Sequence, residues 1–255
     1  MIKSCTIKDK IIGEGRPKIC VPIVGRTRDD IVAAALEIKK ESSRCRIDVV
    51  EFRADFFEKL YDFDSVKDIM VELKRILDGM VLLFTIRSEA EGGEKLAFST
   101  PDIISINSFV ISNRLADMVD VELFSGDSAV DSQIKLAREN DVKIIMSSHD
   151  FKTTPDEQEI INRLCRMQDM GADIAKIAVM PEDEKQLVTL LHATVMMQQD
   201  YARIPIVTIS MGRLGAISRV TGKIFGSAMT FAAVQKTSAP GQLSVEEVNK
   251  IIDII

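Results

Sequence analysis

The sequence predicts a (β/α)8 barrel, in which eight parallel strands alternate with helices around one axis. Eight short runs rich in β-branched and apolar residues recur along the 255-residue chain, and segments of helical periodicity separate them. The runs are almost continuously apolar, which is typical of parallel strands covered on both faces. No low-complexity linker divides the chain, and about 250 residues suit one such barrel. We therefore expect a single domain over residues 1–255.

The expected strands cover residues 18–25, 48–55, 80–88, 118–124, 143–150, 173–181, 204–212 and 227–234. The expected helices cover residues 29–42, 64–79, 101–118, 128–142, 155–171, 181–200 and 245–255. The helix at 155–171 has the clearest boundaries, because Thr154 can serve as its N-cap, Pro155 suits its first position and Gly171 follows its end. Residues 1–17 are expected to form a small hairpin that closes the bottom of the barrel. The competing fold is a doubly wound open sheet. That fold favours a GxGxxG motif after the first strand, and "VGRTRDD" is not one.

The charge and cysteine content narrow the class of protein. The chain carries 33 Lys and Arg against 39 Asp and Glu, a net charge of -6, so nucleic acid and anionic membranes are not expected partners. The four cysteines are scattered without a CxxC pair, and neither a signal-peptide core nor a long apolar span is present. We expect a cytoplasmic protein whose partners are small molecules or a second copy of itself. With only His149 and His192, far apart in the chain, no metal site is expected.

Polar residues gather at the carboxyl ends of the expected strands, where the active sites of such barrels lie. Several are spaced by two, which places each set on one face of its strand. These sets are Glu51, Arg53 and Asp55; Asp120 and Glu122; and Ser147 and His149. The barrel lumen is the face that we expect them to share. For Glu51 and Arg53, a structural ion pair and a functional role are both open. Arg53, Arg87 and Arg219 form a positive set in an acidic protein, which favours a substrate with a carboxylate or phosphate.

The stretch "DIAKIAVMP", residues 173–181, places Lys176 in the middle of an apolar strand. A closed barrel has no edge strand from which a lysine could reach water. Burial disfavours the ammonium form, so the pKa falls and the free amine can attack a carbonyl carbon. We interpret Lys176 as the nucleophile of a Schiff-base enzyme. His149 is the base that would take a proton from the carbon next to the imine.

The whole chain, in order, resembles the type I 3-dehydroquinate dehydratases. The matching stretches are "VEFRAD", "FTIRSEAEGGE", "DVELF", "IIMSSHDF", "DIAKIAVMP", "SMGRLGAISRVTGKIFGSAMTFA" and "SAPGQ". The resemblance implies a (β/α)8 barrel that works as a homodimer without cofactor or metal. It also implies the substrate, 3-dehydroquinate, and the reaction, a syn elimination of water that gives 3-dehydroshikimate in the shikimate pathway.

By the same resemblance, Lys176 forms an imine with the C3 ketone, His149 abstracts the C2 proton and protonates the departing C1 hydroxyl, and Glu91 orients His149. We expect the partner of Lys176 to be His149, with Glu91 behind it, rather than a neutralising carboxylate. Arg219 is the expected clamp for the substrate carboxylate. The other expected substrate-binding residues are Glu51, Arg53 and Arg87 at the ring hydroxyls, Met211 and Phe231 as apolar walls, and Ser238 and Gln242 on a closing loop.

Two positions depart from the pattern of the family. Ser148 stands where Asn, His or Tyr is usual, and Ile209 stands where Met can occur. Neither departure removes a catalytic group, so they bear on the fine tuning of the pocket and not on the reaction. Two other functions compete with the dehydratase. A class I aldolase would share the lysine but act on phosphorylated sugars, and a metabolite-binding regulator would keep the pocket without catalysis. A biosynthetic role and a catabolic role use the same chemistry, and the sequence does not separate them.

Overall fold

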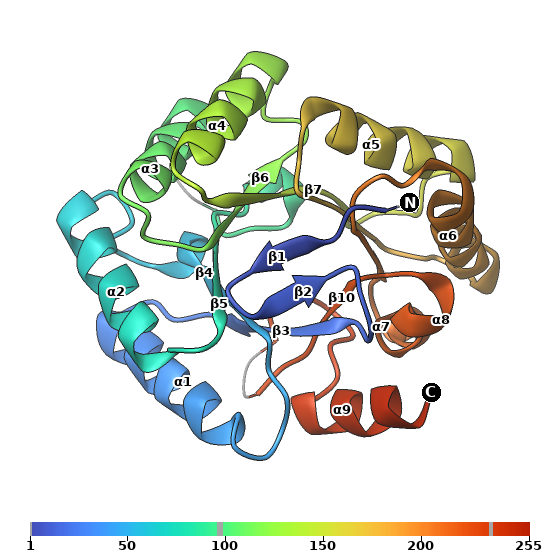
Figure 1. The fold of residues 1–255 in the computed structure, drawn as a ribbon, viewed down its shortest axis with the longest axis horizontal. Coiled ribbons are helices and arrows are strands. Elements are labelled where there is room, and N and C mark those ends of the chain that lie inside the picture. The colour runs from blue at the N-terminus through green and yellow to red at the C-terminus, as the bar shows by residue number, and fades with distance from the viewer. Residues whose placement is uncertain (1, 96–98, 235–236) are drawn as a thin grey trace.

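The eight expected strand segments pair in parallel in one sheet that curves into a barrel (Figure 1). The computed structural model describes residues 2–95, 99–234 and 237–255. The strands are β3 (Lys18–Ile23), β4 (Val49–Arg53), β5 (Val81–Thr85), β6 (Met118–Glu122), β7 (Lys143–Asp150), β8 (Ile174–Val179), β9 (Ile206–Ser210) and β10 (Met229–Phe231). Their order in the sheet is β10-β3-β4-β5-β6-β7-β8-β9. The backbone N–H of Ala228, just before β10, donates to the carbonyl oxygen of Ile206 in β9 at 2.8 Å, which brings the two ends of the sheet together. The predicted barrel is thus confirmed, and the open sheet is wrong.

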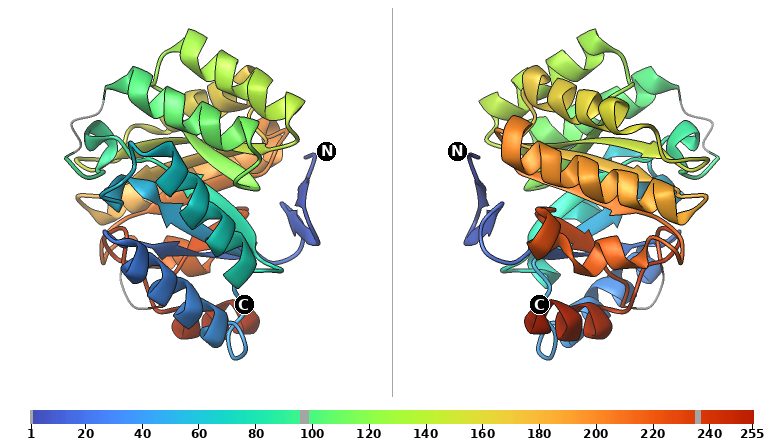
Figure 2. Two further views of the ribbon diagram at one scale, coloured as in Figure 1. Left: turned by 90° about the vertical axis from the view of Figure 1, so that its left-hand side faces the viewer. Right: turned by 90° about the vertical axis from the view of Figure 1, so that its right-hand side faces the viewer.

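A ring of helices covers the outside of the barrel (Figures 1 and 2). These are α1 (Arg28–Glu41), α2 (Phe63–Ile76), α3 (Thr100–Ser112), α4 (Asp127–Glu139), α5 (Glu157–Met170), α6 (Glu184–Met196), α7 (Ala216–Val220), α8 (Gly222–Phe225) and α9 (Val245–Ile254). Short 3-10 turns follow β4 and β5 at Ala54–Phe56 and Glu89–Glu91, and a π-helical turn, Met197–Tyr201, ends α6. In the part of the chain that the structure describes, no helix is long and apolar enough to cross a membrane.

Two of the predicted helix boundaries are wrong. The N-cap of α5 is Asp156, whose side chain accepts a hydrogen bond from the backbone N–H of Glu159, while the backbone N–H of Thr154 donates to the side chain of Gln186. A carboxylate interacts more favourably than a hydroxyl with the positive end of the helix dipole. The expected helix 101–118 ends at Ser112, and Arg114 then takes a left-handed backbone conformation with φ 50° that turns the chain toward β6. The predicted end of α5 at Gly171 is confirmed, with φ 99°.

The apolar core has two layers because strand side chains alternate between two faces. The larger layer lies between the sheet and the helices, and includes Phe52, Phe84 and Leu164. The smaller layer fills the lumen near the amino ends of the strands, with Val49, Val81, Met118, Ile145 and Ile174 among its members. Because these aliphatic side chains occupy the lower lumen, its polar residues are left to the carboxyl end.

A hairpin closes the lower end of the barrel, as expected from residues 1–17. Strands β1 (Cys5–Ile7) and β2 (Lys10–Ile12) pair antiparallel, and Lys8 in the turn has φ 54°. Cys5, Ile7 and Ile12 are buried and pack into the inner apolar layer. The hairpin crosses the barrel axis in Figure 1 and stands at one end of the molecule in Figure 2.

Candidate active site

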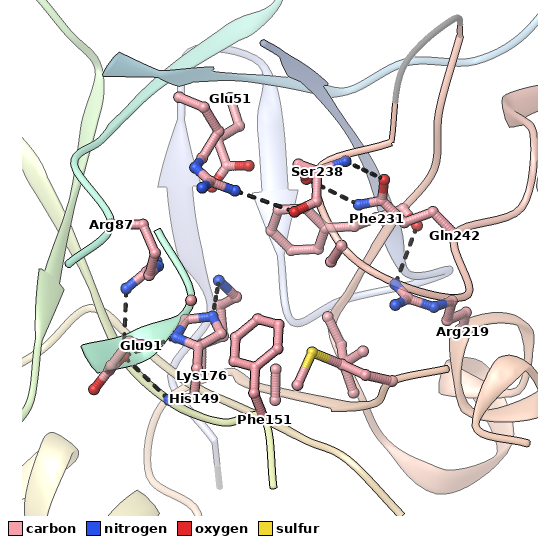
Figure 3. Close-up of a pocket in the computed structure, with 16 residues that line it drawn as sticks. Glu51, Arg87, Glu91, His149, Phe151, Lys176, Arg219, Phe231, Ser238 and Gln242 are labelled. Atoms are coloured by element: carbon pink, nitrogen blue, oxygen red, sulfur yellow. Dashed lines mark hydrogen bonds and ion pairs between the residues drawn. The ribbon is translucent and has the colours of Figure 1, made fainter. Parts of the chain in front are cut away.

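All eleven side chains expected in the site line one cavity at the carboxyl end of the barrel (Figure 3). The cavity encloses an empty volume of about 450 Å³. Five further residues line it: Gly92, Phe151, Ala178, Ile209 and Ala239. Two of these follow from spacing, since Ala178 follows Lys176 by two and Ile209 precedes Met211 by two. Ser148 does not line the cavity, because it lies on the outer face of β7 and accepts a hydrogen bond from Arg163 at 3.4 Å.

The lysine, histidine and glutamate of the site form a linear chain of contacts. Lys176 on β8 places its Nζ 3.0 Å from Nε2 of His149 on β7. Glu91 lies in the turn after β5, and its Oε2 is 2.8 Å from Nδ1 of His149. The same oxygen accepts a hydrogen bond from the backbone N–H of His149 at 3.1 Å. Because Oε2 already acts as an acceptor there, the contacts assign the ring hydrogen to Nδ1. The lone pair of Nε2 then faces the lysine.

Burial sets the protonation tendencies of these three groups. Burial lowers the pKa of Lys176, and the nearby Asp120 carboxylate opposes this shift. Burial also lowers the pKa of His149 well below its ordinary value, and the positive charge of Arg87 adds to this shift. Burial also raises the pKa of Glu91, and the Arg87 guanidinium opposes that rise. The imidazole is therefore neutral at neutral pH, so its basic nitrogen is available beside a lysine whose ammonium form is disfavoured.

The expectation that Lys176 has no carboxylate partner is wrong. Asp120 on β6 reaches it, with Oδ2 3.7 Å from Nζ, and neither side chain is more than 5% exposed. The Phe231 ring centroid lies 4.9 Å from Nζ on another side. Lys176 and Asp120 stand on strands separated by β7, and alternate strands of a barrel contribute to one layer of the lumen.

Arg87 is the centre of a buried charge cluster. Its Nη2 donates to Asp120 at 2.8 Å, and its Nη1 donates to Glu122 at 2.9 Å and to the Ser147 hydroxyl at 2.9 Å. Glu91 lies 3.5 Å from the same Nη1. Although burial disfavours its charge, these carboxylates raise the pKa of Arg87 above its ordinary value. Protein groups therefore accept hydrogen bonds from most of the N–H groups of Arg87, and Arg87 holds in place the carboxylates that surround Lys176 and His149.

Arg53 pairs with Asp55 and not with Glu51. Its Nε and Nη2 donate to the two oxygens of Asp55 at 2.8 and 2.7 Å, and its Nη1 donates to the carbonyl of Ser238 at 3.3 Å. Glu51 instead accepts from the Thr85 hydroxyl at 3.0 Å. The suggested Glu51–Arg53 ion pair is therefore wrong, and Glu51 is one of the residues that line the cavity.

Arg219 has an environment unlike that of the other arginines. It is 2% exposed, and its Nη1 and Nη2 donate to the carbonyls of Phe231 and Pro240 at 3.5 and 2.8 Å. Its buried Nε has no hydrogen-bond partner among the residues that the structure describes. No carboxylate of the described residues lies within ion-pair distance of it. Burial lowers the pKa of Arg219 to about 10, so the group stays charged at neutral pH. A buried, uncompensated guanidinium beside a cavity is a site for an anion.

The loop after β10 closes one side of the cavity. The backbone N–H of Ser238 donates to the side-chain oxygen of Gln242 at 2.9 Å, and the Gln242 amide donates to the Ser238 hydroxyl at 3.1 Å. The backbone N–H of Gly212 donates to the carbonyl of Pro240 at 3.1 Å. Met211 and Phe231 add apolar wall, each at most 4% exposed. Arg219 lies with this loop, across the cavity from Glu91 and His149 (Figure 3).

Gly92 and Phe151 determine the shape of the cavity rim. Gly92 has φ 84°, and a Cβ built on it would lie 2.3 Å from the Phe151 ring. We expect Gly92→Ala to displace Phe151 and to destabilise the protein by about 1–3 kcal/mol, since the left-handed backbone disfavours alanine as well. Chemical denaturation will measure this loss. Gly79→Ala, also at positive φ but with nothing within 4 Å of the added Cβ, is the control for backbone strain alone. An equal loss in both variants would contradict the steric part of this prediction.

Among the described residues, no group of three or more His, Cys, Asp or Glu side chains is arranged to hold a metal ion. The carboxylates of the site are matched instead by Arg53, Arg87 and Lys176. The arrangement can therefore supply a nucleophilic amine, a base next to it and an anion clamp at the far wall. Together, the fold and the site define the class of protein, which is a (β/α)8-barrel enzyme.

Comparison with known proteins identifies the family. The family model described as type I 3-dehydroquinase matches residues 19–255. The 3-dehydroquinate dehydratase of Clostridioides difficile (strain 630) is 46% identical over 255 residues, which span 100% of this chain and 98% of that protein. That of Salmonella agona (strain SL483) is 43% identical over 254 residues, with 100% and 99% covered. A solved type I 3-dehydroquinate dehydratase from Clostridium difficile, with covalently modified comenic acid, has a TM-score of 0.95 at 46% identity over 100% of this chain and 98% of that one. The chain belongs to the type I 3-dehydroquinase family.

Proposed function

We propose that this protein dehydrates 3-dehydroquinate to 3-dehydroshikimate by syn elimination of water through an imine on Lys176, a step of the shikimate pathway. The family and the names of its relatives support the substrate and the net reaction. The observation that carries the mechanism is the 3.0 Å contact between the Lys176 amine and a His149 ring that Glu91 orients. A relative of known structure contains a covalently modified ligand, which is consistent with covalent catalysis.

The first step makes the imine. The lone pair of the Lys176 amine adds to the C3 carbonyl carbon, and the carbonyl oxygen leaves as water after protonation. Amine, ketone and one proton thus give an iminium ion and one water molecule. His149, 3.0 Å from Nζ, is placed to receive and return the protons of this exchange. The low pKa of the buried lysine favours the reactive free amine.

The second step removes the C2 proton. His149 accepts it at Nε2, and the C–H electron pair moves into the enamine while the iminium nitrogen is neutralised. The enamine electrons then expel the C1 hydroxyl, which leaves as water with the proton that His149 returns. The Glu91 carboxylate on Nδ1 stabilises the imidazolium that exists between these two transfers. Water then hydrolyses the conjugated imine, and Lys176 is regenerated.

The substrate spans the cavity in this proposal. Its carboxylate would bind Arg219 and its ketone would react with Lys176, and both residues line the cavity drawn in Figure 3. Glu51, Arg53 and Arg87 would face the ring hydroxyls, with Met211 and Phe231 as walls. Ser238 and Gln242 would cover the bound ring, since their loop is already tied to Arg53 through the Ser238 carbonyl. Ile209 lines the same wall as Met211.

A direct assay tests the proposed function. Purified protein mixed with 3-dehydroquinate should raise the ultraviolet absorbance of the conjugated enone product. Borohydride added during turnover should leave a stable adduct on Lys176, which peptide mass spectrometry will locate. If no enone forms, or if retro-aldol cleavage of a sugar phosphate is faster than dehydration, the proposal fails. Binding of 3-dehydroquinate without turnover would identify a metabolite-binding regulator.

We expect Arg219→Gln to raise the KM for 3-dehydroquinate by about 10²–10³-fold, because a buried charged hydrogen-bond partner of the carboxylate is lost. The turnover number should fall less, since the lysine and histidine stay in place. Steady-state kinetics will separate the two constants. Arg213→Gln changes an exposed arginine in the turn between β9 and α7; it is the matched control and should behave like the wild type. A KM unchanged by Arg219→Gln would contradict the carboxylate clamp.

We also propose that residues 1–255 work as one domain in a cytoplasmic homodimer, as the family resemblance suggests. Sedimentation of the purified protein will give its mass in solution. A monomer mass at micromolar concentration would exclude the dimer.

A further inference from the structure

Asp120 stands directly behind the reacting lysine without lining the cavity. Its side chain is completely buried, and its Oδ2 lies 3.7 Å from the Lys176 Nζ and 2.8 Å from Arg87 Nη2. Its Oδ1 accepts a 2.6 Å hydrogen bond from the Ser147 hydroxyl. Although burial alone would raise the pKa of Asp120, Arg87 and Lys176 lower it, so the carboxylate is ionised at neutral pH. A bound substrate would meet Lys176 from the other side, because Asp120 is absent from the cavity wall.

The surroundings of Nζ make Asp120 its nearest countercharge. The charged or titratable groups that face Lys176 come from every side of the lumen: His149 on β7, Asp120 on β6, Glu51 on β4, Cys20 on β3 and Arg87 after β5. β10 presents the Phe231 ring, and β9 presents the apolar Val207 opposite Lys176 in register. Among the carboxylates of the described residues, that of Asp120 is within ion-pair distance of Nζ and that of Glu51 is not.

In the proposed imine mechanism, this nitrogen carries a positive charge in some states and not in others. The resting ammonium and the iminium both carry it, whereas the free amine that attacks the ketone does not. A buried positive charge needs a negative partner, since an opposite charge within about 4–6 Å favours the charged form. We infer that Asp120 is a positioning residue that serves as the fixed countercharge of Lys176 in the resting ammonium and in the iminium. This inference rests on the proposed function for the iminium but not for the resting ammonium.

A purely structural role for Asp120 is the competing explanation, because the same oxygen holds Arg87. Glu122 separates the two explanations. It also accepts from Arg87, at 2.9 Å, but is not within ion-pair distance of Lys176. Glu122→Gln therefore removes a carboxylate from Arg87 and leaves the countercharge, while Asp120→Asn removes the countercharge and keeps a hydrogen-bonding side chain of the same shape.

The first experiment needs no substrate. The full protein is labelled with trace acetic anhydride from pH 5 to 11, and mass spectrometry of the Lys176 peptide gives the midpoint at which its amine becomes reactive. We expect Asp120→Asn to lower this midpoint by about one unit or more relative to the wild type, because the ammonium loses its partner. Glu122→Gln should shift it by less than half of that change. An unchanged midpoint in Asp120→Asn, or an equal shift in Glu122→Gln, overturns the inference.

The second experiment follows the iminium. At pH 7, with 3-dehydroquinate and borohydride, Asp120→Asn should form reduced adduct on Lys176 about tenfold more slowly than the wild type, although its free amine is more abundant. A rate equal to that of the wild type overturns the iminium part. If even the wild type forms no adduct, the proposed function has failed, and the labelling experiment still decides the role of Asp120 toward the ammonium.

Asp120→Ser provides a second route if Asp120→Asn does not fold, because the smaller side chain leaves space for an added anion. Its labelling midpoint should also be lowered, and formate should restore it toward the wild-type value. A midpoint equal to that of the wild type in Asp120→Ser overturns the inference, and so does a lowered midpoint that formate does not move.

Discussion

Lys176→Met is expected to lower dehydration of 3-dehydroquinate by at least about 10⁴-fold, because the variant has no amine to form the imine. Borohydride should leave no adduct in the site. The stability should not fall with the activity. Removing one partner of a buried ion pair is destabilising where the other charge is left uncompensated, but Asp120 keeps Arg87 as a partner, and the cost of burying the lysine charge is removed as well. The variant should therefore unfold at the same temperature as the wild type or at a higher one.

The measurements are the enone assay, borohydride trapping and thermal unfolding. Lys185→Met, which changes an exposed lysine at the start of α6, is the matched control and should keep wild-type activity and trapping. If Lys176→Met retained more than about one hundredth of the wild-type rate, the imine mechanism would be wrong even if the family reaction were observed. A large loss of stability would show instead that the activity was lost through misfolding.

His149→Asn should lower the turnover number by about 10²–10⁴-fold, the usual contribution of a general base. The asparagine amide can still donate to Glu91 from the position of Nδ1, but no basic nitrogen faces the lysine. Lys176 is still present, so the imine can form and should accumulate. We therefore expect borohydride to modify a larger fraction of Lys176 in this variant at steady state than in the wild type, although product forms slowly.

His192→Asn is the control for this experiment, since His192 is exposed and its Nδ1 interacts with the Glu157 carboxylate on the surface of the protein, away from the cavity. Stopped-flow absorbance and trapping after different delays will separate imine formation from proton abstraction. Loss of trapping together with turnover would mean that His149 acts mainly in making the imine. Retention of full turnover would exclude it as the base.

Much of the site follows from the two-residue period of a strand. Because side chains two apart share a face, Lys176, His149 and Asp120 could be assigned to the lumen from the sequence, and parallel strands bring their carboxyl ends to one end of the barrel. The structure places all eleven expected residues around one cavity. Strand periodicity accounts for residues such as Lys176 and His149, whereas Glu91, Arg219, Ser238 and Gln242 lie outside the strands and were expected from the family resemblance. Their roles stay predictions until the variants are measured.

Local sequence patterns did not predict all of the helices or their boundaries. The four and five residues of α8 and α7 are too short to show a helical period, and they went unpredicted. At α5, Thr154 and Asp156 are both good N-caps, and the structure selects Asp156, with the Thr154 backbone bound to Gln186 of α6. That choice depends on a contact between elements 32 residues apart, which local sequence does not contain.

The sequence by itself determined the fold, the end of the barrel that holds the site and the strand residues that face it, because periodicity is a local property of the chain. Its resemblance to the family added Glu91, Arg219, Ser238 and Gln242. Only the tertiary structure decided which charges pair. Arg53 has carboxylates two residues away on either side and binds Asp55, while Lys176 meets Asp120 across β7 and not only the adjacent His149. Pairing depends on the register and tilt of strands around the closed barrel, which bring alternate strands into one layer of the lumen. Spacing along a single strand contains no information about that register.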